Sequence, residues 1–415
     1  MKKVDVLVIG AGPSGTITAA LLKKAGLDVI IVEKLIFPRF VIGESLLPRC
    51  MEALEEAELL EAVKARGYQE KFGAKFVHQD GRVFDINFSE AHTPGWVWTW
   101  QVPREDFDLT LATACQQKGI PVHYQTEVVD IQINADESSR TLVRFADGAE
   151  EWIEARYIVD GSGYGRVIPK LFHLEKESQL PARQTLFTHF EDIHRADVRQ
   201  EPNRITIYIY NQKTWIWCIP FSNGVTSLGF VGSPEFFTNL EGSETKKMRD
   251  LVASHPELQE RFGQSPMRFE PRTLKSWSVT TDRFYGPGYV LTGNVTEFLD
   301  PVFSSGVTLA SVTAQNAARL VIRKLQGETV DWENEYMQPC TRGVNVFRTF
   351  VNSWYNGDLP TIFFSEDQNV DMRRQISSVL AGYVWDESNQ FVRQHEKYVG
   401  KLAQFLRTRE SSVHL

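Results

Sequence analysis

Cysteine and methionine are scarce in this 415-residue chain, which has four cysteines and six methionines. The cysteines, Cys50, Cys115, Cys218 and Cys340, are widely separated in the sequence. Their spacing fits neither a disulfide framework nor a metal-binding motif. We therefore expect no metal site and four reduced, mostly buried thiols, as in a cytoplasmic protein.

Long apolar runs and clusters of basic residues are also lacking. The apolar segment Val6–Ile9 follows two lysines, as in a signal peptide, but Gly10-Ala11-Gly12-Pro13 interrupts it at once. No uninterrupted stretch is long enough to span a bilayer. Acidic side chains outnumber basic ones by 53 to 45, giving a net charge of −8. These absences argue against export, a membrane span and nucleic-acid binding.

The composition is otherwise that of a globular protein, with 42% hydrophobic and 24% charged residues. A chain of this length predicts two or three packed units. Aromatic residues are abundant, with 10 Trp, 12 Tyr and 26 Phe. Such rings fill cores, and they also suit a site for a flat aromatic ligand.

A dinucleotide-binding motif begins the chain. Val4–Ile9 is a nearly continuous apolar run, typical of a strand buried on both faces of a parallel sheet. The glycine turn Gly10–Gly15 follows, then a predicted helix over Ser14–Lys24 and a second predicted strand over Asp28–Glu33. This strand–turn–helix context distinguishes a genuine G-x-G-x-x-G motif from a glycine turn without a ligand.

Each part of the motif has a physical role. Gly10 permits the tight turn, Gly12 lets the backbone approach a pyrophosphate, and Gly15 allows the helix to pack closely. The free amides and the dipole of the helix N-terminus attract the phosphate charge. Glu33 ends the second strand, where a carboxylate binds a ribose.

Four later segments resemble those of FAD oxidoreductases of the para-hydroxybenzoate hydroxylase type. Because they occur in the family's order, the resemblance favours FAD over NAD. Asn294 stands where the family has an aspartate, and its amide can still accept the ribityl hydrogen bond. The segments are Phe37–Leu46 with Gly43-Glu44-Ser45, the Arg-x-x-x-Asp of Val102–Asp108, Tyr157–Gly163, and Val290–Asn294 followed by Asp300-Pro301 and Ser304-Ser305-Gly306.

The resemblance implies a set of FAD contacts, all non-covalent because no motif for a flavin–protein bond is present. They are Gly10, Gly12, Pro13, Ser14, Gly15, Glu33, Lys34, Arg39, Ser45, Arg104, Val128, Asp160, Gly161, Gly293, Asn294, Pro301, Gly306 and Val307.

The expected fold is α/β (α+β overall) and has three parts. A discontinuous Rossmann-like FAD-binding domain comprises residues 1–75, 100–175 and 270–328. Residues 76–99 and 176–269 form a substrate-facing antiparallel sheet. Residues 329–415 form a C-terminal helical region, whose segments with Phe347, Tyr355-Asn356-Gly357 and Val384-Trp385-Asp386 resemble the cap of phenol-directed halogenases. Alternation predicts strands over Ile205–Tyr210, Thr214–Pro220, Val225–Val231 and Ala91–Trp100, the last with three indoles on one face.

The string Thr214–Pro220 contains Trp-x-Trp-x-Ile-Pro, which resembles the signature of flavin-dependent halogenases. Trp215 and Trp217 lie at i and i+2, so their indoles share one strand face. The resemblance implies that they restrict the approach of substrate to the flavin. Two indoles on one face can also be simple core, and geranylgeranyl-reductase-like FAD enzymes have a related pattern. The Ile219-Pro220 ending favours the halogenase, as does Gly43-Glu44-Ser45, which resembles a segment of a subset of flavin halogenases and related FAD oxidoreductases.

In this family reduced FAD, O₂ and chloride or bromide give a hypohalous acid, which a lysine holds and directs at the substrate. The segment Tyr68–Phe76 resembles the one that bears it, with Lys71 aligned to the catalytic lysine and Lys75 as second choice. The alternative is that both are ordinary surface lysines. Ser305 and Gly306 precede a predicted helix over Val307–Arg323 and match the family's halide site, unless they only contact the flavin ring.

The sequence therefore predicts a two-component halogenase that acts on a phenolic or pyrrolic ring, free or tethered to a carrier protein. Only one dinucleotide motif is present, so a separate reductase would supply reduced flavin. The alternative is an FAD-dependent reductase or dehydrogenase, or an aromatic monooxygenase, of the same fold.

Overall fold

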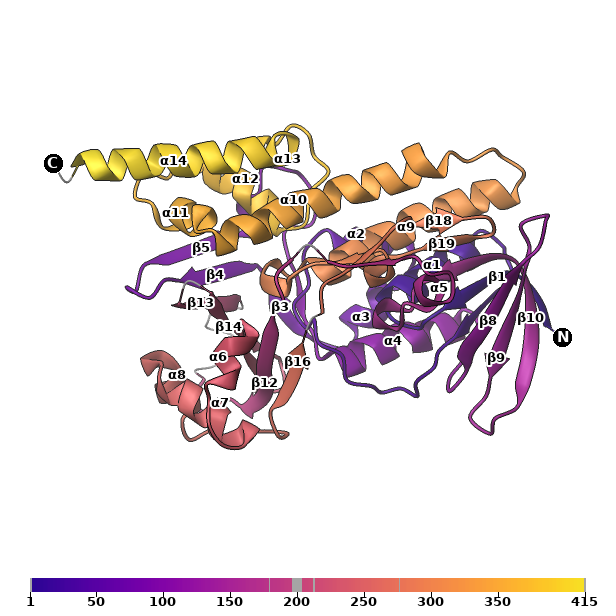
Figure 1. The fold of residues 1–415 in the computed structure, drawn as a ribbon, viewed down its shortest axis with the longest axis horizontal. Coiled ribbons are helices and arrows are strands. Elements are labelled where there is room, and N and C mark those ends of the chain that lie inside the picture. The colour runs from indigo at the N-terminus through magenta and orange to yellow at the C-terminus, as the bar shows by residue number, and fades with distance from the viewer. Residues whose placement is uncertain (1, 179, 196–203, 212, 276, 414–415) are drawn as a thin grey trace. The chain divides into compact units, whose positions relative to one another are not determined.

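The computed structural model describes residues 2–178, 180–195, 204–211, 213–275 and 277–413 (Figure 1). The chain forms two compact units. Unit 1 comprises Met1–Arg66, Pro103–Gln179 and Val279–Asn345. Unit 2 comprises Gly67–Val102, Leu180–Ser278 and Val346–Leu415. The predicted mixture of a Rossmann-like sheet, an antiparallel sheet and C-terminal helices is confirmed; the three residue ranges assigned to them remain a prediction.

Unit 1 is built on an eight-stranded sheet with the order β18-β19-β10-β1-β2-β7 and the hairpin β8–β9 paired beside β10. The strands from β19 to β7 are parallel, as expected of a dinucleotide-binding sheet. The predicted strand–turn–helix–strand is confirmed as β1, α1 and β2. The strand bounds are β1 Lys2–Ile9, β2 Val29–Val32, β7 Val122–His123, β8 Glu127–Ile133, β9 Ser139–Arg144, β10 Glu150–Asp160, β18 Tyr285–Gly286 and β19 Tyr289–Leu291.

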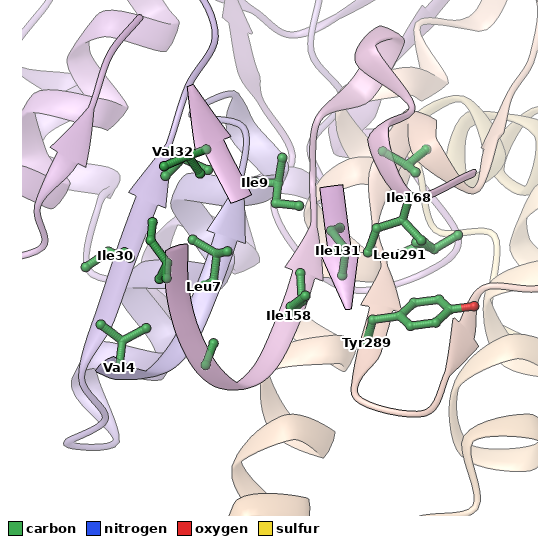
Figure 2. Packing of buried hydrophobic residues seen from close by; sticks show 14 residues of the cluster. Val4, Leu7, Ile9, Ile30, Val32, Ile131, Ile158, Ile168, Tyr289 and Leu291 are labelled. Atoms are coloured by element: carbon green, nitrogen blue, oxygen red, sulfur yellow. The ribbon is translucent and has the colours of Figure 1, made fainter. Parts of the chain in front are cut away.

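Apolar side chains cover both faces of this sheet, which explains the continuous apolar run of β1. Leu7 and Ile9 of β1 lie with Ile30 and Val32 of β2 in one cluster, which Figure 2 shows. Side chains of β8, β9 and α5 (Val167–Leu171) pack on that cluster. The helices α1 (Pro13–Lys24) and α9 (Ser305–Leu325) contact the sheet and each other. Each fully buried aliphatic side chain contributes about 1.5–3 kcal/mol.

Smaller elements complete unit 1. The helices are α2 Cys50–Glu56, α3 Leu60–Lys64 and α4 Arg104–Gln117, with the short turns η2 Gly163–Gly165, η3 Gly293–Val295, η4 Pro301–Phe303 and η5 Glu333–Met337. A three-stranded sheet comprises β11 Glu175–Lys176, β17 Val279–Thr281 and β20 Glu297–Phe298. The helix α10, Gln338–Tyr355, begins in unit 1 and continues into unit 2 from Val346.

Unit 2 contains a seven-stranded sheet with the order β16-β12-β15-β14-β13-β4-β5. Its strands are antiparallel except for the parallel pair β13–β4. Three of the predicted strands are confirmed as β13, β14 and β15. The bounds are β4 Gly73–Val77, β5 Val83–Asn87, β12 Gln184–Glu191, β13 Ile205–Asn211, β14 Thr214–Pro220, β15 Val225–Gly232 and β16 Arg272–Lys275.

The residues of β14 alternate between two environments. Ile216 and Cys218 belong to a cluster with side chains of α6 (Pro234–Thr238), α7 (Glu244–Ala253) and α8 (Pro256–Phe262). Trp215 and Trp217 therefore point to the opposite face, as the i, i+2 spacing predicts. The C-terminal helices of this unit are α11 Asp358–Phe364, α12 Val370–Leu380, α13 Gln390–Arg393 and α14 His395–Val413 (Figure 1).

The strand predicted over Ala91–Trp100 is wrong for most of its length. Only Thr99–Gln101 forms a strand, β6, which pairs with β3 (Gln69–Lys71). Upstream, the His92 amide donates to Arg374 O (3.0 Å) and the Thr93 amide to Ser378 Oγ (2.9 Å), so these amides bond to α12 rather than to a strand. The three indoles at 96, 98 and 100 still pack edge to face in succession.

The four cysteines are free and buried, as expected. Among the described helices, none is long and apolar enough to cross a membrane.

Candidate functional site

The glycine turn after β1 packs so closely that side chains are excluded at two of its positions. The Gly10 amide donates to Val32 O (2.8 Å) and the Gly161 amide to Ile9 O (2.9 Å). A Cβ on Gly15 would lie 1.9 Å from Gly10 O, and one on Gly10 would lie 2.7 Å from Gly161 O. At Gly12 a Cβ would make only ordinary contacts, with Arg39 Nη2 at 3.5 Å and Asp108 Oδ2 at 3.9 Å. The space over Gly12 is therefore open, as the close approach of a phosphate to this residue requires.

The first turn of α1 lies against the segment that carries the second predicted FAD motif. Ser14 Oγ donates to Thr292 Oγ1 (2.7 Å). A Cβ on Gly293, where φ is +63°, would lie 3.1 Å from the Ser14 Cβ. Gly12 is the N-cap of α1 and Pro13 its first residue, and no side chain caps the helix. The first-turn amides thus remain available to an anion.

Two buried carboxylates organise the loops around this turn. Glu33 accepts the amides of Ala11 and Leu35 through different oxygens, each at 2.9 Å. A carboxylate has about four acceptor positions, so ribose hydroxyls can still donate to Glu33. Asp160 accepts the amides of Ser162 (3.0 Å) and Ile168 (2.7 Å). Burial raises the pKa of Asp160, and its oxygens hold the turn that contains Gly161.

Two arginines meet at one buried aspartate. Arg104 pairs with Asp108 through both of its oxygens (2.8 and 3.1 Å) and also donates to the carbonyls of Ile42 and Gly43. Burial opposes the charge of Arg104, but nearby negative charge, mainly that of Asp108, raises the pKa of Arg104 overall. Arg39 Nη1 lies 3.2 Å from Asp108 Oδ2, is fully buried and makes no hydrogen bond to any residue that the structure describes. Asp108 therefore holds Arg39 beside Gly12, where its charge suits a pyrophosphate.

The helix α9 begins two residues earlier than predicted, at Ser305, because Ser304 serves as its N-cap with a left-handed backbone (φ +56°). Ser305 and Gly306 thus belong to the first turn, whose amides no side chain caps. A Cβ on Gly306 would lie 3.1 Å from the Phe298 ring and 3.9 Å from Asn294 Oδ1.

The remaining FAD contacts implied by the resemblance also lie in unit 1. Lys34 is exposed and pairs with Glu127 (2.7 Å), Val128 is half-buried in β8, Ser45 and Val307 are buried, and Pro301 begins η4. The glycine cradle, the uncapped helix and Arg39 together fit the turn, pyrophosphate and charge requirements of FAD.

Lys71 ends β3 in unit 2 and is buried, with 1% of its surface exposed. Its Nζ lies 5.5 Å from the centroid of the Phe88 ring. Lys75, on β4, is half-buried. Since lysine is almost never fully buried without a partner or a function, the structure separates the two candidate lysines by environment.

Trp215 and Trp217 are both buried, and their ring centroids lie 6.1 Å apart. Trp215 Nε1 donates to Tyr355 Oη (2.9 Å), and Trp217 Nε1 donates to Ser227 Oγ (3.0 Å). Trp217 pairs in register with Gly229 of β15, and a Cβ there would lie 2.2 Å from the indole. The indole therefore lies flat across the neighbouring strand.

Sequence reasoning missed Asp108 as the partner of Arg39, and Tyr355 and Gly229 as the supports of the indoles. Asp108 had a signal, because it is the Asp of the Arg-x-x-x-Asp segment. The other two depend on strand register and on a helix far along the chain, which no local pattern reports.

A family model described as "FAD binding domain" matches residues 3–332. The 1H-pyrrole-2-carbonyl-(peptidyl-carrier protein) brominase of Pseudoalteromonas luteoviolacea (strain 2ta16) is 28% identical over 395 residues, with 93% of each chain covered. The crystal structure of a flavoprotein/dehydrogenase from Cytophaga hutchinsonii is 49% identical, with a TM-score of 0.96 over 99% of this chain and 100% of that chain. The flavin-dependent brominase Bmp2 is 25% identical, with a TM-score of 0.84 over 98% and 100%.

Proposed function

The chain belongs to the FAD binding domain family, and from that premise we propose that it is a two-component flavin-dependent halogenase acting on an electron-rich aromatic ring. It is an FAD-dependent oxidoreductase. The proposal concerns the reaction: the introduction of chlorine or bromine into a phenolic or pyrrolic substrate, with reduced flavin supplied by a separate reductase. When bound, reduced FAD with O₂ and a halide ion supplies the electrophilic halogen.

The observation that carries the proposal is the burial of Lys71. Lysine side chains are almost never fully buried, so a position that keeps one inside is a candidate functional site. A buried amine beside an aromatic ring is a fixed hydrogen-bond donor from which competing water is excluded. Such a donor can hold a hypohalous acid and orient it, which an exposed, mobile lysine cannot do.

The two buried tryptophans support the same function. Their Nε1 atoms are fixed by Tyr355 and Ser227, so the indoles form a rigid aromatic wall rather than movable side chains. A wall of this kind limits which molecules reach a reactive centre and favours a small halide ion over an aromatic ring. The uncapped first turn of α9, with the amides of Ser305 and Gly306, suits a halide.

The kind of substrate is suggested by the pyrrole brominase among the relatives. By its name, that enzyme acts on a pyrrole-2-carbonyl group attached to a peptidyl carrier protein. We propose a pyrrolic or phenolic acyl substrate for this chain, free or carrier-bound.

A second candidate function is an FAD-dependent dehydrogenase or reductase, or an aromatic monooxygenase, without halide chemistry. It is favoured by the 49% identical protein that is described as a flavoprotein/dehydrogenase. The two candidates differ in one product, since only the halogenase gives a carbon–halogen bond.

The test uses the FAD-bound protein with reduced FAD, O₂, sodium bromide and a panel of phenols and pyrroles. The expected result is a product with the paired bromine isotope peaks in its mass spectrum. Lys71→Met keeps most of the side-chain volume and removes the amine, and we expect it to lower bromination by about 100-fold or more. Flavin content and the rate of flavin reoxidation should stay near the wild-type values.

Lys75→Met is the matched control, because Lys75 lies four residues away in the same unit and is only half-buried. It should brominate normally. Loss of bromination in Lys75→Met but not in Lys71→Met would transfer the role to Lys75. A wild-type protein that oxidises or hydroxylates the panel and never brominates it would favour the second candidate.

A further inference from the structure

Arg183 of unit 2 is a buried cation that pairs with no carboxylate among the residues that the structure describes. Its side chain precedes β12 and is 8% exposed, and its Nε is fully buried without a hydrogen bond. Within the part of the chain that the structure describes, no carboxylate or carbonyl accepts from it. Among the described residues its guanidinium lies against Tyr355, whose ring centroid is 3.8 Å from Arg183 Cζ.

This isolation sets Arg183 apart from the other buried arginines. Arg104 and Arg166 each pair with a carboxylate, at 2.8 and 2.9 Å respectively. A buried charge is usually paired, and an unpaired one marks a place where a ligand completes the pairing. Stacking on Tyr355 stabilises the cation only in part and leaves the in-plane N–H groups unused.

The support of Arg183 is rigid. Tyr355 Oη accepts the Nε1 hydrogen of Trp215 (2.9 Å), which fixes the ring on which the guanidinium lies. Strand register brings these residues together: Gln184, next to Arg183, pairs with Gly232, and the adjacent Val231 pairs with Trp215. Arg183 therefore lies at the same end of the sheet as the first of the two tryptophans.

We propose that Arg183 binds an oxyanion carried by the aromatic substrate and so determines which substrates are accepted. A guanidinium held against a ring still presents paired, coplanar donors that match a carboxylate or a phosphate. The oxyanion can be the carboxylate of a free aromatic acid or the phosphodiester of a carrier arm. The inference rests on the proposed function in that the oxyanion belongs to the molecule that is halogenated.

Binding to the oxidised FAD-bound protein tests the site without turnover. Pyrrole-2-carboxylate and pyrrole-2-carboxamide share one ring and differ in charge, and 4′-phosphopantetheine represents the carrier arm. Each is titrated calorimetrically and by quenching of tryptophan fluorescence. We expect pyrrole-2-carboxylate or 4′-phosphopantetheine to bind about 10- to 100-fold more tightly than the amide, and the one that does so identifies the source of the oxyanion.

Substitutions assign the preference to Arg183. Arg183→Gln should abolish it, and Arg183→Lys should retain part of it, because the charge remains while the paired donors are lost. Tyr355→Phe keeps the ring and should keep the preference, whereas Tyr355→Leu should weaken it. Arg272→Gln is the control, since Arg272 also lies over a ring, that of Phe269 at 4.5 Å, but is exposed.

Equal binding of all three probes to the wild type, or no binding of either anion, would overturn the proposal, as would an unchanged preference in Arg183→Gln. The thermal midpoint and flavin content of each variant show whether it folds, and the lysine and leucine variants give independent readings if the glutamine variant does not. A protein that brominates a neutral phenol but does not distinguish the probes keeps the proposed function and loses this site. One that binds an anion through Arg183 and never brominates keeps the site and loses the function.

Discussion

Replacing Gly229 by alanine should displace the indole of Trp217 and destabilise unit 2. The new Cβ would lie 2.2 Å from Cζ2 of that indole, more than 1 Å inside normal contact, so either the ring or the strand must move. Overpacking of this kind costs about 1–3 kcal/mol. A displaced indole also loses its hydrogen bond to Ser227, worth about 1 kcal/mol. Alanine gains about 0.5–1 kcal/mol over glycine in a strand, which leaves a net loss of about 1–3.5 kcal/mol.

Urea unfolding followed by tryptophan fluorescence measures this loss. With a slope of about 2–3 kcal/mol per molar urea, the midpoint should fall by about 0.3–1.7 M. Near-ultraviolet circular dichroism should also change, because Trp217 leaves its fixed position. FAD binding should persist, since the substitution lies outside unit 1.

Gly400→Ala is the matched control. Gly400 lies in α14 of the same unit, and a Cβ there meets nothing within 4 Å. This substitution should stabilise the protein by about 0.5–1 kcal/mol, the ordinary gain in a helix. If Gly229→Ala unfolds at the wild-type midpoint, the indole does not lie over Gly229 and the description of the tryptophan wall is wrong.

Three further predictions concern the cofactor, the anion site and pH. Gly12→Val should abolish FAD binding while the protein stays folded, because the space at Gly12 is open until a ligand fills it. Gly15→Ala should also lower the thermal midpoint, because its Cβ would clash with Gly10 O. Flavin absorbance measures FAD binding and calorimetry measures the thermal midpoint of both variants. Bromide should alter the flavin spectrum saturably. Ser305→Pro should weaken that effect without disturbing the helix, since proline suits the first helical position. An unchanged response to bromide in this variant would exclude the first turn of α9 as the halide site. Burial lowers the pKa of His123 and His395 below the unfolded value of about 6.5. Below that pH the unfolded state binds more protons, so stability should fall on acidification from pH 7.5 to 5.5, less so in His395→Gln; a rise would contradict it.

The strand–turn–helix at the start of the chain could be predicted because its signals are local. Apolar continuity marks the β1 strand, and the glycines mark the turn that follows. The alternation of Thr214–Pro220 likewise predicts β14 to the residue. The segment Ala91–Trp100 has a similar alternation but forms a strand only at its end. There, hydrogen bonds to α12 replace those of a sheet, and no local pattern reports that competition.

The partners of the candidate site residues could not be predicted for a related reason. Tyr355 contacts both Trp215 and Arg183 from positions more than a hundred residues away. Gly229 matters only because strand register places it beside Trp217. Sequence patterns indicate which face a residue takes, whereas contacts across strands and helices follow from the assembled fold.

The pairing of β3 with β6 contains the most informative departure from ordinary sequence rules. The segment Gln69-Glu70-Lys71 reads as an exposed polar strand, yet Gln69 and Lys71 are buried and only Glu70 is exposed. Gln101 of β6 is also buried; its Nε2 donates to Pro220 O (2.7 Å), and its Oε1 accepts no hydrogen bond from the residues that the structure describes. Apolar side chains at these positions would stabilise the fold more, because buried polar groups bring little net gain even when they are satisfied. A strand that buries its polar side chains at this cost in stability is expected where chemistry requires them. The hydrogen bond from Gln101 joins the β3–β6 pair to Pro220, at the end of β14, which carries both tryptophans.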